Sequence, residues 1–217
     1  VDLQVDAVTF QGIGGQAEIV DNYYQGADPE VPDPDPAIQD VVDFWLDRES
    51  DELGEVIGYT ATGIYDWPLN NMSSDALLMA WPEAHLAVMS TTGFRSSYSP
   101  GDISVADTVS VQPFENYLVV IELTGAQIID LFDSLYWPQC IAGALVDKSN
   151  GQTTVVVDGG SINPASTYNL VTTDYMLCQP DYFPYQVPAE NVTFTHIHWR
   201  QATEDWIRAK DSSGEDP

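Results

Sequence analysis

The segment at residues 117–135 constrains the fold more than any other part of the sequence. A run of strand-like composition, YLVVIEL, leads directly into TGAQIIDLFDSLY, whose apolar residues recur at helical spacing. Thr124 is well suited to cap that helix, because its hydroxyl can accept a hydrogen bond from a free backbone N–H of the first turn. Ile128, Leu131 and Phe132 then share one face. The segment therefore predicts a strand that continues directly into an amphipathic helix.

Strand and helix patterns are mixed along the rest of the chain. Helices are expected at residues 36–49, about 71–81 and about 200–211, and strands at 55–63, 85–90, 140–146, 153–157 and 168–172. Asp158-Gly159-Gly160 predicts a tight turn, and residues 174–190 an aromatic-rich loop. Because the patterns do not alternate strictly as β–α–β, we expect the α+β class, with mixed sheets and packed helices, rather than a doubly wound sheet.

The first 35 residues differ in character from the rest. Residues 1–25 alternate around glycines as in a hairpin, and the following GADPEVPDPDPA is rich in Pro and Asp, as in an extended linker. Asp28, Asp33 and Asp35 are alternative calcium ligands, but the segment lacks the glycine-containing turn of a calcium loop. We therefore divide the chain into a hairpin with its linker at 1–35 and a main domain at 36–217.

The charge of the chain excludes some partners. Its 34 acidic residues meet only 6 Lys and Arg, for a net charge of -28 at pH 7, so we expect no binding to nucleic acid. No apolar run is long enough to predict a membrane span. Such an acidic surface is typical of a secreted protein, extracellular or periplasmic, from a saline habitat. Cys140 and Cys178 fit either one disulfide or two buried thiols, and we favour the disulfide.

Five segments, taken in order, carry a resemblance to a known family. They are EVIGYTATGIYD, NNMSSDALLMAW, AVMSTTGFR, GDISVADTVSVQPFENYLVVIELTGAQIIDLF and YNLVTTDYMLCQPDYF. Over about residues 53–185 and the final helix, the chain resembles the C-terminal domain of 5'-nucleotidases. In that family an N-terminal domain carries a two-metal phosphoesterase centre, and the C-terminal domain holds the nucleoside. Residues 1–25 resemble the closing strands of the N-terminal domain, so we expect a junction with a missing catalytic domain there.

The resemblance implies a pocket in which two aromatic rings sandwich a base. Phe114 matches the first ring and Tyr175 the second. Asp181 matches the residue that binds the ribose hydroxyls, and Arg95 the arginine that closes a Gly-rich loop reaching sugar and phosphate. The candidate substrate-binding residues are therefore Phe114, Tyr175, Asp181, Arg95, Ser90 and Gly93.

The chain also departs from the family pattern around this pocket. The family loop Asn-Gly-Gly-Gly-Ile-Arg is Ser-Thr-Thr-Gly-Phe-Arg at residues 90–95, which removes an amide and adds β-branched side chains. Tyr65 stands where a second phosphate-directed arginine is expected. The loop Asn-Gly-Gly-Asp-Gly has become Cys-Gln-Pro-Asp-Tyr at residues 178–182. These departures predict a weak or altered affinity for nucleotides.

The histidine count argues against phosphate-ester hydrolysis by this chain alone. A two-metal centre needs several His ligands with Asp and Asn around ions about 3.5–4 Å apart, and the chain has 3 His. His196 and His198 would suit a single zinc or copper ion on one strand face, but a polar strand face is the simpler interpretation. We expect no catalytic residue, no metal ligand and no cofactor in this chain, and divalent metals only in an upstream domain.

The sequence therefore predicts a domain that recognises a nucleoside or nucleotide and is not catalytic alone. Its expected partners are that ligand, and either an upstream metallophosphoesterase domain or a second copy of the chain. The alternative is a structural or interaction module with a degenerate pocket. In that case Tyr175, Tyr182, Phe183 and Tyr185 would supply side chains of the kind enriched at protein interfaces.

Overall fold

The computed structural model describes residues 2–5, 12–16, 35–135, 139–149, 151–183 and 186–214. It divides into two units, Val1–Arg48 and Glu49–Pro217, which are described separately. In the first unit β1 (Asp2–Val5) pairs antiparallel with β2 (Gly12–Gln16). The helix α1 (Pro36–Leu53) follows, and Asp35 Oδ1 accepts a hydrogen bond from the backbone N–H of Ala37 at 2.8 Å. The predicted linker, with Asp28 and Asp33, lies outside the described residues, and the boundary at 35/36 stays a prediction.

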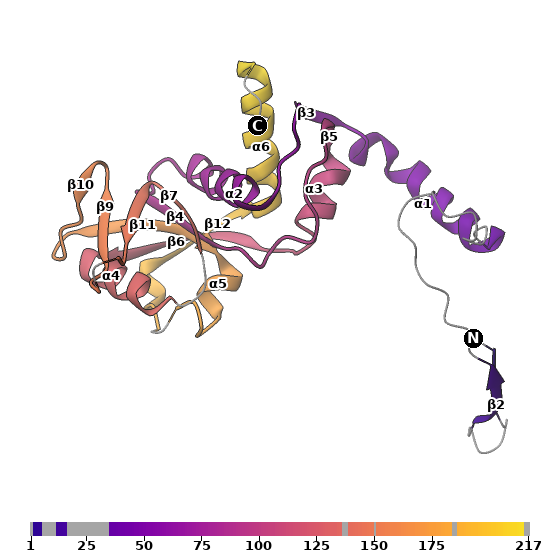
Figure 1. Ribbon diagram of the computed structural model, residues 1–217, viewed down its shortest axis with the longest axis horizontal. Helices are drawn as coiled ribbons and strands as arrows, with labels where there is room; N and C mark the ends of the chain where they lie inside the picture. The colour runs from indigo at the N-terminus through magenta and orange to yellow at the C-terminus, as the bar shows by residue number, and fades with distance from the viewer. Residues whose placement is uncertain are drawn as a thin grey trace. The chain divides into compact units, whose positions relative to one another are not determined.

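The second unit is built on a mixed five-stranded sheet with the order β12-β6-β11-β4-β7 (Figure 1). Its strands are β4 (Leu86–Ser90), β6 (Tyr117–Thr124), β7 (Gln139–Ala142), β11 (Thr167–Thr173) and β12 (Val192–His198). Strand β11 is parallel to β4, whereas the other neighbouring pairs are antiparallel. Two smaller sheets join β3 (Val56–Thr60) to β5 (Gly101–Ser104), and β8 (Ala144–Asp147), β9 (Thr154–Val157) and β10 (Gly160–Ser161) to one another.

Helices cover both faces of the five-stranded sheet. The helices are α2 (Asp66–Ala80), α3 (Val105–Val111), α4 (Gly125–Ser134), α5 (Asp174–Cys178) and α6 (Trp199–Ser213), with a short 3-10 turn at Ala189–Asn191. Helices α2 and α6 pack on one face, and α4 and α5 with β9 pack on the other (Figure 1). Successive side chains of β6 point to opposite faces of the sheet and so contribute to the hydrophobic core on each face. Leu118 faces α2 and α6, while Val119 faces α4. The α+β class is confirmed.

The strand and helix predicted at residues 117–135 are confirmed. Thr124 Oγ1 accepts a hydrogen bond from the backbone N–H of Gln127 at 3.2 Å, and Gln127 Oε1 accepts one from the Thr124 N–H at 2.8 Å. This reciprocal capping box fixes where the strand becomes a helix. The predicted turn at residues 158–160 joins β9 to β10, with Asp158 at φ 53 and Gly159 at φ 75, as a two-residue hairpin of type I′ requires.

Several predicted elements need correction. The strand expected at 140–146 is divided at Gly143, at φ 73, into β7 and β8, which lie in different sheets. Helix α2 begins at Asp66 rather than near Asn71, since Pro68 lies in its first turn, where the missing N–H would have no intrahelical partner. The segment at 174–190 is not all loop, because Thr173 caps the short helix α5 by accepting a hydrogen bond from the Met176 N–H at 3.3 Å.

The preferred disulfide is wrong, because Cys140 and Cys178 are both free. Cys140 is buried in the core beneath α2 and α6, whereas α5, which carries the exposed Cys178, packs through Met176 in the core of the opposite sheet face. Burial raises the pKa of the Cys140 thiol to about 12. The cysteines therefore carry no information about the redox compartment.

Among the described residues, no helix combines the length and the apolar character that crossing a bilayer requires.

Candidate functional site

The topology brings four distant segments to one edge of the sheet. The parallel strands β4 and β11 end there at Ser90 and Thr173. Strand β12 ends beside them at His198, which is paired with Tyr117 at the start of the antiparallel β6. Loops that leave this edge therefore converge, as they do outside the carboxyl ends of strands in other open sheets.

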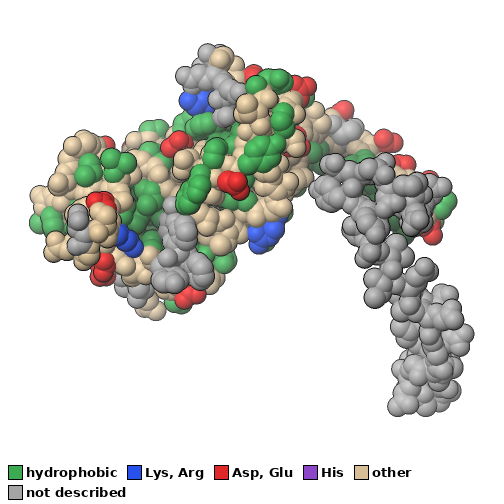
Figure 2. All heavy atoms as spheres, in the orientation of Figure 1, with side chains coloured by type: hydrophobic (Ala, Val, Ile, Leu, Met, Phe, Trp, Pro, Cys, Tyr) green, Lys and Arg blue, Asp and Glu red, His purple; other side chains and the backbone are tan. Residues whose placement is uncertain are grey.

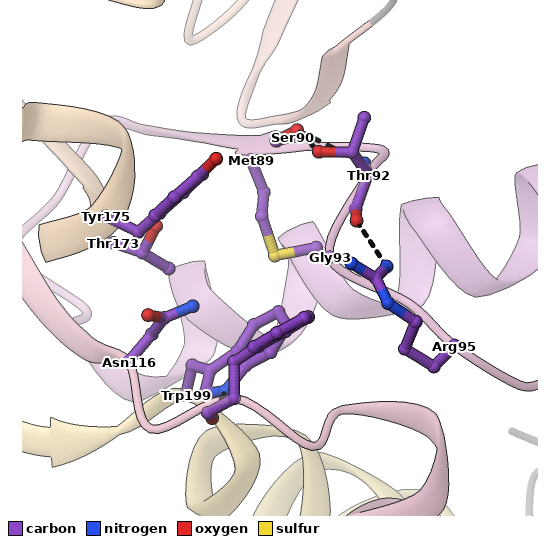
Figure 3. A pocket seen from close by; sticks show the side chains of 10 residues that line it. Met89, Ser90, Thr92, Gly93, Arg95, Asn116, Thr173, Tyr175 and Trp199 are labelled. Carbon is purple, nitrogen blue, oxygen red and sulfur yellow. Dashed lines mark hydrogen bonds between the residues drawn. The ribbon is translucent and has the colours of Figure 1, made fainter. Parts of the chain in front are cut away.

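A cavity of about 270 Å³ lies at this edge. It is lined by Met89, Ser90, Thr92, Gly93, Arg95, Phe114, Asn116, Thr173, Tyr175 and Trp199. We call Phe114, Asn116 and Tyr175 the aromatic wall, Ser90, Thr92, Gly93 and Arg95 the loop wall, and Trp199 the floor. Figure 3 shows Tyr175 across the hollow from Trp199 and Arg95. The volume is slightly below the range of roughly 300–1,000 Å³ that is usual for small-molecule sites.

The aromatic wall presents rings that no core residue covers completely. Phe114 is 40% exposed and Tyr175 is 45% exposed, whereas Trp199 is 1% exposed and forms the floor. The Asn116 carboxamide makes no hydrogen bond to any residue in the described part of the chain. Two half-exposed rings and a free amide on one cavity suit a flat ligand with hydrogen-bonding edges.

The junction of β12 and α6 holds the aromatic wall in place. Trp199 Nε1 donates to the carbonyl of Phe114 at 2.7 Å, and the Trp199 N–H donates to the carbonyl of Asn116 at 3.0 Å. Arg200 Nη1 donates to the carbonyl of Gln112 at 2.8 Å, and its Nη2 lies 2.8 Å from Glu115 Oε1. Residues 112–116 are therefore fixed at four points by residues that follow them by more than eighty positions.

The same junction carries two groups with shifted pKa values. The hydrogen bond from Arg200, together with its charge, lowers the pKa of Glu115. Burial, and then the charge of Arg200, lower the pKa of His198. His198 Nδ1 accepts a hydrogen bond from the Arg200 N–H at 3.2 Å, and Nε2 lies 3.2 Å from Glu115 Oε2. His198 is thus a neutral helix cap beside an ionised carboxylate.

Most polar groups of the loop wall are hydrogen-bonded within the loop or to Tyr182. Ser90 Oγ lies 2.8 Å from Thr92 Oγ1 and 2.9 Å from the hydroxyl of the buried Tyr182. Arg95 Nη1 donates to the carbonyl of Thr92 at 2.8 Å (Figure 3). It also donates to the carbonyl of Phe94 at 2.9 Å. The Arg95 guanidinium carbon also lies 4.6 Å from the centre of the Phe114 ring, in a cation–π contact that joins the two walls.

Gly93 is required by packing. A Cβ at this position would lie 2.9 Å from the Trp199 ring, which is too close for a side chain. The one glycine kept from the Gly-rich family pattern therefore lets the loop wall lie against the floor.

Of the predicted site residues, all except Asp181 line the cavity. Asp181 lies in the turn after α5 and is exposed. The cavity is also lined by residues that were not predicted from the sequence, namely Met89, Thr92, Asn116, Thr173 and Trp199. Asn116 had a weak signal, because it follows the predicted ring Phe114 by two positions. Trp199 had none, because a buried tryptophan is usually part of the core.

The structure places His196 and His198 at the end of β12. No group of three or more His, Cys, Asp and Glu in the described ranges could hold a metal ion. His196 lies in an irregular part of β12, at φ 60, while His198 serves as the cap described above. The preferred interpretation of these residues, a polar part of the final strand, fits this arrangement.

Comparisons with known proteins give a consistent result. The family model described as 5'-nucleotidase, C-terminal domain, matches residues 56–187. Protein UshA of Escherichia coli is 33% identical over 109 residues, which are 46% of this chain and 20% of UshA. Endonuclease YhcR of Bacillus subtilis is 27% identical over 192 residues, 81% of this chain and 15% of YhcR. The chain thus spans about a fifth or less of the length of these relatives.

A solved structure extends the likeness to the fold. The 5'-nucleotidase precursor from Thermus thermophilus superposes with a TM-score of 0.67 at 17% identity. The match covers 80% of this chain and 40% of that protein.

Proposed function

Because the chain belongs to the family of 5'-nucleotidase C-terminal domains, we propose that its cavity binds the nucleoside part of a nucleoside or nucleotide. The observation that carries the proposal is the pair of half-exposed rings, Phe114 and Tyr175, on one cavity of about 270 Å³. A base has two apolar π-faces, and each stacking contact with an aromatic ring contributes about 1–3 kcal/mol.

The polar lining residues complete this assignment. The free Asn116 carboxamide offers a donor and an acceptor to the edge of a base. The hydroxyls of Ser90 and Thr92 suit the sugar, and Gly93 lets them approach it. Asp181, as the ribose-binding carboxylate, would have to turn toward the cavity from its exposed position, so its role stays part of the proposal.

Hydrolysis belongs, in this proposal, to another domain. We infer that this chain binds and does not cleave, and that an upstream metallophosphoesterase domain with divalent metals supplies the chemistry. That arrangement agrees with the small share of its relatives that the chain spans. A location outside the cytoplasm, extracellular or periplasmic, is proposed on the charge of -28.

Titration with adenosine tests the proposal. Trp199 is the floor of the cavity, so a bound base should quench part of the tryptophan fluorescence, and isothermal calorimetry should give the same dissociation constant. Ribose, which lacks the base, is the matched control ligand and should give no response in the same range. Absence of saturable binding at millimolar adenosine in both measurements would contradict the proposal.

A second candidate function, an interaction module, is favoured by one observation. The apolar residues of α1 are exposed, namely Ile38, Val41, Val42, Phe44, Trp45 and Leu46. The aromatic segment at 174–190 is less suitable than the sequence suggested, because Tyr182 and Phe183 are buried, while Tyr185 lies outside the described residues. Light scattering after size exclusion tests this role, and a strict monomer at high concentration would count against self-association.

A further inference from the structure

We propose that the cavity accepts uncharged nucleosides in preference to their phosphates. This inference rests on the proposed function, and it concerns which form of the ligand the same site takes. Its basis is the position and the existing contacts of the charged side chains around the cavity.

Arg95 is the only Lys or Arg among the described residues that line the cavity. Its Nη1 already donates to two carbonyls of its own loop, those of Thr92 and Phe94. Its guanidinium also rests on Phe114, 4.6 Å from the ring centre. These contacts occupy Nη1 and one face of the guanidinium, so a phosphate could approach Arg95 with two hydrogen bonds only along the Nε–Nη2 edge.

Arg200 is the other cation close to this wall, and it is neutralised. It does not line the cavity, and it is bound to the Gln112 carbonyl and the Glu115 carboxylate on the side of the loop that faces α6. A guanidinium with a carboxylate at 2.8 Å presents little net charge to a ligand at a greater distance.

A carboxylate lies next to the lining residues at the end of β11. Asp174 lies between Thr173 and Tyr175 in the sequence, whereas the charge of Glu115 is already paired with Arg200. Asp174 is held there because its Oδ1 accepts hydrogen bonds from the backbone N–H groups of Tyr117 at 3.2 Å and Tyr175 at 2.7 Å.

Asp66 lines the adjoining hollow, which shares Arg95 with the cavity. Figure 2 shows acidic side chains scattered over the face in view, with few basic ones. A phosphate that carries up to two negative charges would therefore meet, beyond Arg95, a surface with an excess of charge of its own sign.

The loop wall offers neutral groups instead. Ser90 and Thr92 line the cavity with hydroxyls that form a cluster with the Tyr182 hydroxyl. Hydroxyls both donate and accept hydrogen bonds, so they match the hydroxyls of a sugar without adding or requiring charge.

Adenosine and AMP, titrated in parallel by calorimetry, test the inference. At an ionic strength of about 0.05 M we expect adenosine to bind at least about five-fold more tightly than AMP, because like charges repel. At about 1 M the Debye length shrinks to about 3 Å and the ratio should approach one. Circular dichroism at both ionic strengths checks that the chain is folded.

Two variants identify the cause of the preference. Arg95→Gln should weaken the binding of adenosine and of AMP by the same factor, because Arg95 contacts the Phe114 ring and not the phosphate. Tyr65→Arg adds a cation at an exposed residue of the adjoining hollow, and it should raise AMP affinity several-fold while leaving adenosine affinity unchanged. Tyr59→Arg is the matched control, since Tyr59 is also exposed and lines neither hollow.

The outcomes separate this inference from the proposed function. Tighter binding of AMP than of adenosine at low ionic strength, lost selectively in Arg95→Gln, would overturn the inference and leave nucleoside binding in place. Failure of both ligands at both ionic strengths would overturn the proposed function, and this inference with it.

Discussion

The two walls of the cavity differ in which of their groups are left available to a ligand. On the aromatic wall the backbone is satisfied by Trp199 and Arg200, which leaves the Phe114 and Tyr175 rings and the Asn116 amide available to a ligand. On the loop wall the side chains of Ser90 and Arg95 are themselves the hydrogen-bonding partners. In the proposed function, the aromatic wall can therefore stack a base, although the polar side chains of the loop wall are already hydrogen-bonded within the protein.

Removal of the floor should have the largest effect, because both walls rest on Trp199. Trp199→Ala deletes a fully buried ring, the hydrogen bond to the Phe114 carbonyl and the surface against which Gly93 packs. We expect the free energy of unfolding to fall by about 3–5 kcal/mol, as measured by urea denaturation.

The matched control for this change is Trp67→Ala. Trp67 is 55% exposed, so its removal should change the free energy of unfolding by about 0.5 kcal/mol or less. Equal losses in the two variants would show that Trp199 is not a shared support of the walls.

The rings of the aromatic wall should govern affinity without governing stability. Phe114→Ala and Tyr175→Ala each remove one stacking surface worth about 1–3 kcal/mol, so adenosine affinity should fall by about five-fold to 150-fold. Since both rings are about half exposed, the thermal midpoint should change little. Calorimetric titration of each variant measures the affinity.

Tyr59→Ala is the control for both variants, because Tyr59 is exposed and lies outside the cavity. A loss of affinity in this variant as large as in Phe114→Ala would mean that the titration reports a general loss of structure.

A change at the loop wall should instead lower stability and leave adenosine affinity nearly unchanged. Tyr182→Phe removes the buried hydroxyl that lies 2.9 Å from Ser90 Oγ and 3.3 Å from Thr92 Oγ1. We expect a loss of about 1 kcal/mol in the free energy of unfolding, the usual net value of one hydrogen bond. Adenosine affinity should stay within about two-fold, because the stacking rings are untouched.

Tyr59→Phe, at an exposed residue, serves as the control for loss of a hydroxyl and should leave stability unchanged. If Tyr182→Phe weakens adenosine binding as much as Phe114→Ala does, the loop wall governs affinity as strongly as the rings do, and the contrast between the two walls is wrong.

Local signals in the sequence were sufficient for much of the fold. Thr124 with the apolar face behind it predicted the strand and helix at 117–135, because capping and periodicity act within a few residues. The start of α2 was missed because Pro68 reads as a helix breaker unless its place in the first turn is known. The disulfide was wrong because a sequence does not say on which face of a sheet a cysteine will lie.

The site was only partly predictable, for a reason of topology. Phe114, Tyr175 and Arg95 were predicted through a family resemblance, and the ends of β4, β6 and β11 bring them together. Trp199 and Asn116 meet only because β12 pairs with β6 at this edge. Such a contact depends on the pairing of strands far apart in the chain, and no local pattern encodes it.

The smallest expected effect concerns the support of the aromatic wall at acidic pH. The charged groups that face His198 are Arg200 and Glu204 on α6 and Glu115 on the loop, and burial with Arg200 lowers the pKa of His198 from 6.5. The unfolded chain therefore binds a proton more readily than the folded one, so the stability contribution of neutral His198 is lost as pH falls through about 6.5 and below. Protonation of Nδ1 would also remove the acceptor that caps the Arg200 N–H.

Thermal unfolding between pH 5 and pH 7.5 should expose this dependence, in a range above the one in which the lowered pKa of Glu115 acts. His198→Gln should reduce the fall in the midpoint between about pH 7 and pH 5, because glutamine does not titrate. An NMR titration of His198 should report a pKa below 6.5. An unchanged slope in the variant, or a pKa above that value, would show that residues 112–116 are held independently of the protonation of His198.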